Sequence, residues 1–355
     1  MSSEVSWFSA LCDDDYEFLG VPDPALQSSW EHCRDIALTA ESAGYDNLLL
    51  PSGYAMGIDS IAFAAAIAPL LRRMRLLVAA RMGEMWPPQL ARQLATISQI
   101  LGGRLTVNII SSDIPGETKL ESAPRYRRTL EIMRVLRDLL DGKPVDMHGE
   151  FVAISADPPR IAEVTGGCPP FYFGGQSEAA REVAARGADV FLMWPDTLDR
   201  VAAVLADMRE RAARHGRTLR FGYRAHVIVR ETEEQARAAA RRLLSRLDAA
   251  EGERIRARSL DTRSAGVARQ NELRNRADDE GFVEDNLWTG IGRARSGAGA
   301  AIVGDPDQVL AKLRAYERLG MEAFILSGYP HAAEADLFAR HVLPKMEHGP
   351  LFPAG

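Results

Sequence analysis

Short, almost uninterrupted runs of apolar residues alternate along the sequence with longer segments whose apolar residues recur at helical spacing. A strand that is apolar on both faces is typical of a parallel sheet covered by helices on both sides. The predicted strands are 5–11, 47–50, 76–80, 105–111, 171–173, 190–194, 221–229 and 323–327. The helices predicted to follow them are 27–43, 58–68, 88–101, 124–141, 177–186, 196–215, 233–247 and 332–343. Eight such units favour an α/β fold of the closed (β/α)8 type, a TIM barrel, over an open doubly wound sheet.

Two helix starts carry a recognisable capping pattern. Thr232 is followed by Gln235, and Asp305 is followed by a proline and then Gln308. Both pairs have the spacing of a capping box, and the second places proline at the first helical position. A length of 355 residues suits one barrel with insertions, so we expect a single domain over residues 1–355.

Two segments interrupt the repeat. Residues 142–170 hold five of the 19 prolines and are predicted to be an insertion. Residues 250–299 are longer, polar and rich in arginine. Because compact domains rarely contain so long a connection without a function, we expect this second insertion to be an active-site lid. The alternative is a solvated helical excursion with no role in the site.

The charge balance excludes several classes of partner. There are 43 basic and 49 acidic residues, which gives a net charge of −6 and no basic footprint for nucleic acid or a membrane surface. The longest uncharged apolar run, 61–71, is far below the roughly 20 residues needed to span a bilayer. The N-terminus lacks the cationic start of a signal peptide. Three scattered cysteines, Cys12, Cys33 and Cys168, indicate free thiols or small buried apolar residues in a reducing compartment. We therefore expect a cytoplasmic protein.

Polar residues near the ends of predicted strands mark a candidate site, because a barrel carries its active site at the carboxyl ends of its strands. Arg224 and His226 share one face of their strand. A charge pointing into a barrel should meet an anion or a carboxylate, so we favour an anionic substrate over a buried ion pair. This interpretation requires the barrel strand to end near His226. Asn108 lies inside another strand, where its amide must bond either the backbone or a ligand.

Three more residues follow strands. Trp194 ends the strand at 190–194, where a tryptophan alone is more often a packing residue. Tyr329 and His331 lie directly after the last strand, in a loop that glycine and proline make tight. Both side chains can move protons. Each could be structural, but their place at the same barrel end favours a catalytic role.

The segment Gly174-Gly175-Gln176-Ser177 joins a strand to a helix. Glycines allow close approach of the backbone, and a helix N-terminus offers N–H groups to an anion, so the loop is a candidate phosphate site. The alternative is an ordinary turn with a serine N-cap. The sequence has no spacing typical of metal ligands and none of the Walker, dinucleotide-binding or hydrolase nucleophile motifs, so we expect no metal.

Across almost the whole chain the sequence resembles the two-component, flavin-dependent alkanesulfonate monooxygenases of the bacterial luciferase-like superfamily. The segments that carry the resemblance are 7–8, 105–108, 172–175, 221–232, 286–288, 295–299, 303–305 and 324–331. The segments around Arg224-Ala-His226 and Tyr329-Pro-His331 are specific, whereas the glycine pairs are not.

The resemblance implies a barrel with a mobile lid near Arg295. Reduced FMN would come from a separate NAD(P)H-dependent reductase and would react with O2, and the carbon that bears a sulfonate would be oxygenated to release sulfite and an aldehyde. The residues implied to act in catalysis or to bind the substrate are Trp194, Arg224, His226, Arg295, Tyr329 and His331. The residues implied to hold FMN are Asn108, Tyr126, Gly175, Gln176 and Ser177. The planar fork of arginine suits the oxygens of a sulfonate, and a lid would keep water from the activated flavin.

Three loops depart from the family pattern. The family has a Thr-His pair where this chain has Leu11-Cys12, and a cysteine where this chain has the segment around Met56. The third loop, which contains Met85, is longer than its family counterpart. We expect these loops to form one rim of the pocket, so the substrate is predicted to be bulkier than a short alkanesulfonate, for example a sugar sulfonate.

Three alternatives stay open at this point. The protein could be a luciferase-like monooxygenase that acts on a substrate without a sulfonate, although Arg224 and Arg295 argue against this. It could use a deazaflavin for hydride transfer without O2. It could bind a flavin without catalysis, because a fold does not fix a function. Barrels of this kind commonly associate, so we also expect a homo-oligomer, either a dimer or a tetramer.

Overall fold

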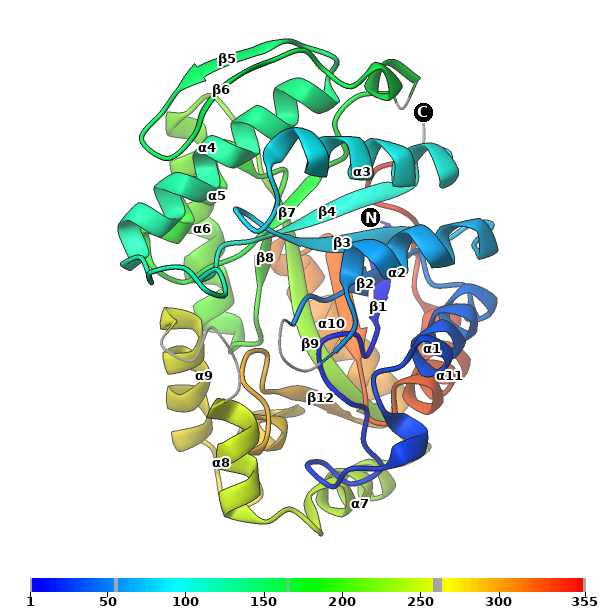
Figure 1. The fold of residues 1–355 in the computed structure, drawn as a ribbon. Coiled ribbons are helices and arrows are strands. Elements are labelled where there is room, and N and C mark those ends of the chain that lie inside the picture. Colours follow the sequence, from blue (N-terminus) through cyan, green and yellow to red (C-terminus); the bar gives the residue numbers. More distant parts are fainter. Residues whose placement is uncertain (1, 54–56, 165, 258–263, 354–355) are drawn as a thin grey trace.

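Eight parallel strands close into a barrel in the computed structural model, which describes residues 2–53, 57–164, 166–257 and 264–353 (Figure 1). In order around the barrel these are β1 (Glu4–Phe8), β2 (Asn47–Leu50), β3 (Arg75–Arg81), β4 (Leu105–Ile110), β7 (Phe171–Phe173), β8 (Val190–Met193), β9 (Arg220–Val229) and β13 (Ala323–Ser327). Each pairs in parallel with the next, and β13 pairs with β1. The predicted barrel and its eight strands are confirmed, because strands covered on both faces leave continuous apolar runs in the sequence.

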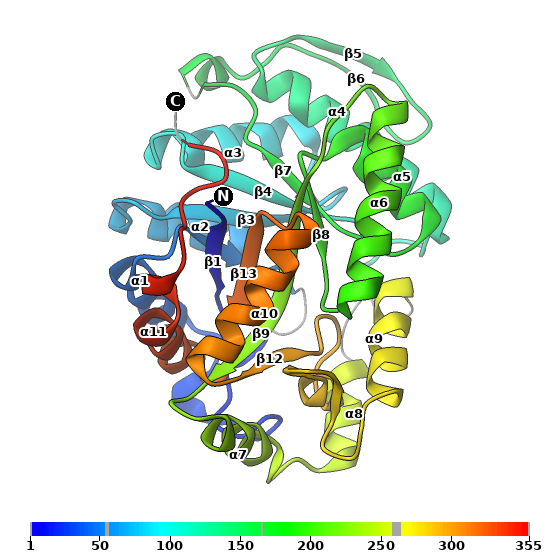
Figure 2. The same ribbon diagram turned by 180° about the vertical axis from the view of Figure 1, so that it is seen from behind.

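Helices cover the outside of the barrel. They are α1 (Trp30–Ala43), α2 (Ser60–Ile67), α3 (Pro87–Ile100), α4 (Ser122–Leu140), α5 (Glu178–Gly187), α6 (Leu198–Arg214), α10 (Pro306–Leu319) and α11 (His331–His341). One predicted helix exists, but it does not occupy the position beside the barrel that the sequence assigned to it. The predicted helix at 233–247 is α7 (Glu233–Leu244), which lies beyond the carboxyl end of β9, and α10 runs beside the barrel in its place (Figure 2).

α7 and α10 take these positions because β9 extends beyond its partners in the barrel. This strand pairs with β13 only as far as His226, and from His226 to Val229 it pairs with an additional strand, β12 (Ala301–Gly304). The chain therefore leaves the barrel after His226 and returns only after β12. This is the strand end that the anionic-site interpretation requires.

The capping pattern at Asp305 is confirmed in full. Its carboxylate accepts from the backbone N–H of Gln308, and the Gln308 side chain accepts from the backbone N–H of Asp305. At Thr232 the structure gives only half of the pattern, with the hydroxyl accepting from the backbone N–H of Gln235.

The first insertion lies outside the barrel, against α4. Residues 142–170 form a hairpin of β5 (Val145–His148) and β6 (Ala153–Ala156) and a short helical turn, η3 (Arg160–Val164), between the end of α4 and the start of β7. The hairpin packs along the outside of α4, where the backbone N–H groups of its turn at 150–152 donate to the Glu131 carboxylate.

Residues 250–299 lie at the carboxyl ends. They contain most of α8 (Ala249–Ala257), α9 (Ala265–Asn275), β10 (Phe282–Glu284), β11 (Leu287–Trp288) and η4 (Gly290–Arg293). The Arg269 guanidinium on α9 forms two hydrogen bonds of 2.7 Å with the buried carboxylate of Asp196, just after β8. The Gln270 side chain also donates to the carbonyl of Pro195. These contacts fix α9 over the mouth of the barrel, where a lid would lie, and the opening of such a lid stays a prediction.

The described part of the chain contains no helix with both the length and the apolar character needed to cross a bilayer. Cys12, Cys33 and Cys168 are free thiols, as predicted.

A buried carboxylate organises the amino-terminal end of the barrel. Glu4 Oε1 accepts from the Tyr172 hydroxyl at 2.9 Å and from the Asn47 amide at 3.2 Å. Its Oε2 accepts from the backbone N–H of Leu351, which ties down the C-terminal segment. Burial raises the pKa of Glu4, although the bonds from Leu351, Tyr172 and Asn47 oppose this shift. Several β-strands and the C-terminal segment thus depend on one acidic side chain.

We expect Tyr172→Phe to lower the free energy of unfolding by about 1.5–3 kcal/mol, because it leaves a buried carboxyl with one donor fewer. Urea unfolding measures this loss. The matched control is Tyr45→Phe, which removes a hydroxyl that donates to a neutral backbone carbonyl, that of Ala335, and should cost about 1 kcal/mol. A smaller loss for Tyr172→Phe than for Tyr45→Phe would contradict the central role of the Glu4 network.

Candidate active site

Two neighbouring strands bring the first polar residues together. Arg224 lies beside Ile325 and His226 lies beside Ser327 in the pairing of β9 with β13. Both Arg224 and His226 are buried. The i, i+2 spacing predicted from the sequence therefore does place both side chains on one strand face.

A chain of hydrogen bonds links these side chains. Arg224 Nη2 donates to Ser327 Oγ at 2.8 Å, and Ser327 Oγ lies 2.8 Å from His226 Nδ1. An arginine can only donate, so the Ser327 hydroxyl accepts from Arg224, and it links that guanidinium to the His226 ring. Sequence reasoning missed Ser327, whose only signal was its place at the end of the last strand.

Arg295 and Tyr329 complete the group. Arg295 Nη1 donates to the Tyr329 hydroxyl at 2.7 Å, and the Tyr329 ring stacks on the His226 ring at 5.3 Å between centroids. The ring of Phe8 lies under both guanidiniums, 4.1 Å from that of Arg224 and 5.2 Å from that of Arg295. The structure thus brings together all four residues that the sequence marked for catalysis.

The group carries two positive charges without a partner of opposite sign. Within the described residues, no carboxylate forms an ion pair with Arg224 or Arg295, and Asp13 acts on Arg295 only from a longer distance. Burial lowers the pKa of Arg224 to about 9, and the charge of Arg295 adds to this effect. Burial and then the two arginines hold the pKa of His226 well below its usual value. Burial raises the pKa of Tyr329 to about 12. The side chains of His226 and Tyr329 are therefore both neutral at pH 7.

His331 lies next to this group and is held by an acidic residue that sequence reasoning missed. Its Nδ1 and its backbone N–H each lie 2.8 Å from a carboxylate oxygen of Asp15, which is fully buried. The same carboxylate lies 3.0 Å from His32 Nε2. The His331 ring stacks on Phe8 and meets the edge of Tyr329. The one signal for Asp15 was its place in the acidic run 13–15 after the first strand.

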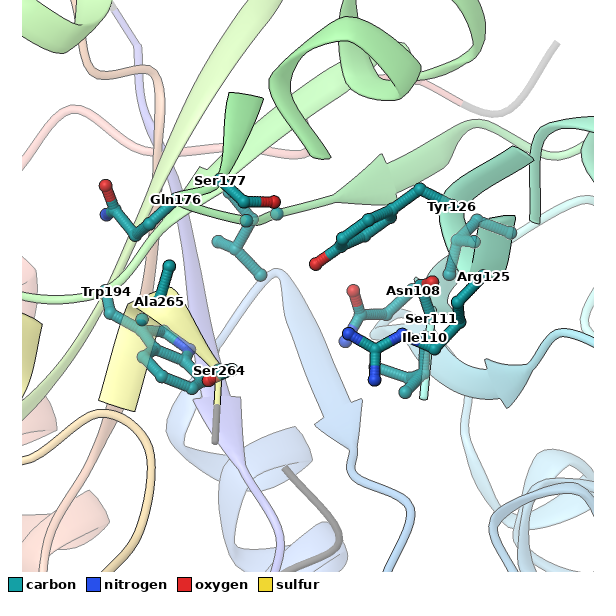
Figure 3. Close-up of a pocket in the computed structure, with 15 residues that line it drawn as sticks. Asn108, Ile110, Ser111, Arg125, Tyr126, Gln176, Ser177, Trp194, Ser264 and Ala265 are labelled. Atoms are coloured by element: carbon teal, nitrogen blue, oxygen red, sulfur yellow. The ribbon is translucent and has the colours of Figure 1, made fainter. Parts of the chain in front are cut away.

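All five residues predicted to hold a flavin line one pocket of about 810 Å³ (Figure 3). Asn108 and Tyr126 come from one side, and Gly175, Gln176 and Ser177 come from the loop between β7 and α5. Figure 3 shows the Tyr126 hydroxyl pointing toward the space between these groups.

Trp194, predicted for the substrate site, also lines this pocket. A Cβ on Gly266 would lie 2.8 Å from its indole, and a Cβ on Gly297 would lie 3.5 Å from it. Gly297 follows Arg295 by two residues, so the indole stands between the pocket and the Arg295 loop. Other lining residues were missed, chiefly Arg125, which precedes Tyr126 on α4, and residues 264–266 at the start of α9.

The loop at Gly174 and Gly175 has no room for larger residues. A Cβ on Gly174 would lie 2.2 Å from the carbonyl oxygen of Leu192, and one on Gly175 would lie 2.4 Å from the Ala180 Cβ. The Ser177 hydroxyl caps α5 by accepting from the backbone N–H of Ala180, as the alternative reading of this loop expects. The cap and a phosphate site are compatible, because a helix N-terminus has several unpaired N–H groups.

The three loops predicted to form the rim lie in different places in the structure. Cys12 contacts Arg295 at 4.0 Å, so the first loop does border the arginine group. Met85 lies in two surface grooves beside α3. Met56 lies outside the described residues. Within the part of the chain that the structure describes, no cluster of three or more His, Cys, Asp and Glu could hold a metal ion.

Comparisons with known proteins agree with this geometry. The chain is 66% identical over 355 residues to a protein of Novosphingobium aromaticivorans named sulfoquinovose monooxygenase, and 98% of each chain is covered. A protein of the same name from Agrobacterium fabrum is 51% identical over 349 residues, which cover 98% of this chain and 90% of that one.

Two solved structures share the fold. EDTA monooxygenase from Chelativorans has a TM-score of 0.77 at 17% identity, with 100% of this chain and 96% of that chain covered. A long-chain alkane monooxygenase has a TM-score of 0.75 at 16% identity, with 99% and 93% covered. The model of the luciferase-like monooxygenase family matches residues 18–323. The chain therefore belongs to the luciferase-like monooxygenase family, and it is an oxidoreductase.

Proposed function

We propose that this enzyme uses reduced FMN and O2 to oxygenate the carbon that bears the sulfonate of an organosulfonate, with release of sulfite and an aldehyde. We further propose a sugar sulfonate as the substrate and a separate NAD(P)H-dependent reductase as the source of reduced FMN. The observation that carries the proposal is the pair of guanidiniums on one phenyl ring, Arg224 buried and Arg295 partly buried, without a paired carboxylate.

Two like charges held close together with little access to water are costly, and a bound anion removes that cost. A sulfonate is a compact monoanion whose three oxygens match the N–H groups of two arginine forks. The Tyr329 oxygen already accepts from Arg295, so its own proton is free to point toward a bound oxygen atom. In this arrangement the arginines hold the sulfonate, and Tyr329 holds a proton near the reacting carbon.

The pocket lined by Asn108, Tyr126 and the loop at 174–177 is the proposed FMN site. The Gly174-Gly175 turn, which a Cβ would fill, allows the backbone to approach a phosphate, and the N-terminus of α5 offers it N–H groups. When bound, reduced FMN supplies the two electrons that let one oxygen atom of O2 reach the substrate carbon while the other becomes water. Trp194 and the start of α9 close the pocket toward the Arg295 loop, which would exclude water from the reaction.

The polar loop after β1 favours a sugar over an alkyl tail. Asp13 is partly buried near Arg295, and its carboxylate lies 3.3 Å from the Tyr16 hydroxyl. The Tyr16 ring meets the Tyr329 ring at 5.8 Å between centroids. A carboxylate and a hydroxyl beside an anion site suit a substrate that carries hydroxyl groups. Sulfoquinovose, the compound in the names of the two curated relatives, is a glucose that carries a sulfonate on C6.

The direct test is sulfite release with reduced FMN from a generic NADH-driven reductase, across a series from methanesulfonate to sulfoquinovose. We expect kcat/KM for sulfoquinovose to exceed that for methanesulfonate by at least about tenfold, since buried polar groups penalise a tail that leaves them unpaired. If FMN binds, as fluorescence quenching would show, and no member of the series yields sulfite, the sulfonate assignment is wrong.

The cofactor site has its own test. Gly175→Ala places a Cβ 2.4 Å from the Ala180 Cβ, so the loop and the first turn of α5 must separate. We expect the Kd for FMN, measured by fluorescence titration, to rise on the order of tenfold, which corresponds to about 1.4 kcal/mol. Gly349→Ala is the control, because a Cβ there meets only the Ser2 hydroxyl at 3.4 Å. Equal FMN affinity in wild type and Gly175→Ala would place the phosphate elsewhere.

A further inference from the structure

We propose that His331, oriented by Asp15, is the base that breaks the carbon–sulfur bond after the substrate carbon has been oxygenated. The proposal rests on the proposed function, since it assigns one step of that reaction. It concerns a carboxylate–histidine pair for which the arginine group and the flavin pocket require no role.

Asp15 is built to be an ionised acceptor. Its two oxygens receive the backbone N–H groups of Tyr16 and His331 and face the rings of His32 and His331. Burial opposes ionisation, but the charge of His331 and the hydrogen bonds from His32 and His331 lower the pKa of Asp15 below its usual value. A carboxylate without a proton can only accept, so the nitrogen atoms that face it must carry protons.

The carboxylate of Asp15 fixes the tautomer of His331. The proton of the neutral His331 ring lies on Nδ1, toward Asp15, which leaves Nε2 with a lone pair. His226 Nδ1 instead faces the Ser327 hydroxyl, which can either donate or accept. His331 is thus the histidine of the site whose accepting nitrogen is defined by its partner. Burial and the two arginines also make a second proton on His226 unfavourable.

The accepting nitrogen of His331 has no partner in the described part of the protein. His331 is only 1% exposed, and its Nε2 is buried without a hydrogen bond to any described residue. A buried acceptor without a partner is costly, so it should meet a ligand. The ring stacks on Phe8, the same ring that lies beneath Arg224 and Arg295. A sulfonate held by these arginines would bring its carbon close to His331.

The step balances without a further reactant. Oxygenation of the carbon gives an α-hydroxysulfonate, R–CH(OH)–SO3−. Nε2 of His331 takes the hydroxyl proton, and the O–H electron pair forms the C=O bond of the aldehyde. The C–S bond breaks, and its electron pair leaves on sulfur as sulfite. His331 becomes a cation next to the Asp15 carboxylate, which stabilises it.

This step can be measured without oxygenation. Hydroxymethanesulfonate is the simplest α-hydroxysulfonate, and sulfite released from it can be trapped by a thiol-reactive dye in the presence of oxidised FMN. We expect the wild-type enzyme to accelerate this release over buffer. The acceleration should fall by about 10²–10⁴-fold in His331→Gln, which removes the base, and in Asp15→Asn, whose amide would donate to Nδ1 and move the ring proton to Nε2.

The matched control is His348→Gln. His348 Nδ1 also faces a carboxylate, that of Asp46, but Asp46 binds the start of β1 at the opposite end of the barrel. This variant should release sulfite at the wild-type rate. If His331→Gln does not fold, Asp15→Asn carries the comparison, because it preserves the size and shape of the side chain.

A second readout is independent of any substrate. In protein labelled with 15N-histidine, the nitrogen shifts should show His331 protonated on Nδ1, and Asp15→Asn should reverse this assignment. The proposal is overturned if the wild-type enzyme does not accelerate hydroxymethanesulfonate breakdown, if His331→Gln retains the acceleration, or if His331 is protonated on Nε2. Sulfite release from sulfonates with reduced FMN tests the proposed function separately, so the two failures are distinguishable.

Discussion

Two guanidiniums share the ring of Phe8 at the mouth of the barrel without a paired carboxylate, and the surrounding structure is arranged around that unpaired charge. Arg224 is held by a backbone carbonyl and by Ser327, and Arg295 is held by the Tyr329 hydroxyl, all of which are neutral acceptors. Neutral acceptors fix the position of a guanidinium while leaving its charge available to an incoming anion. The nearby acids bond elsewhere, since Asp13 accepts from the Tyr16 hydroxyl and Asp15 faces the rings of His32 and His331.

The path of the backbone makes this arrangement possible. β9 continues past its barrel partners at His226 and pairs with β12, so the connection between the last two barrel strands crosses the mouth. That connection carries α9, which Asp196 and Arg269 fix in place, and the loop that contains Arg295. The same excursion brings Gly266 and Gly297 against Trp194, which separates the flavin pocket from the Arg295 loop. One long strand thus joins the proposed anion site, the proposed flavin pocket and the proposed lid.

Much of this was predictable from the sequence, and the reasons are local. The eight strands are apolar on both faces, and the polar residues at their ends interrupt that pattern, so Arg224, His226, Tyr329 and His331 were visible. Residues that act through long-range contacts gave no such signal. Asp15 lies in an acidic run typical of a surface, yet it is buried against a histidine 316 positions away. The displacement of α7 by α10 depends on how far β9 extends, which hydrophobic patterning does not specify. The flavin pocket gains Arg125 and residues 264–266 only through folding.

Calorimetric titration of sulfoquinovose into the enzyme with oxidised FMN, for wild type and Arg224→Met, tests the central claim most directly. Arg209→Met is the matched control, because Arg209 also lies over a phenyl ring, that of Phe221, but on the exposed face of α6. The account predicts that wild type and Arg209→Met bind the sulfonate with equal affinity and that Arg224→Met loses at least about 100-fold, as for a charge-assisted pair in a buried site. Unchanged binding by Arg224→Met would show that the pair formed by Arg224 and Arg295 is not the anion site.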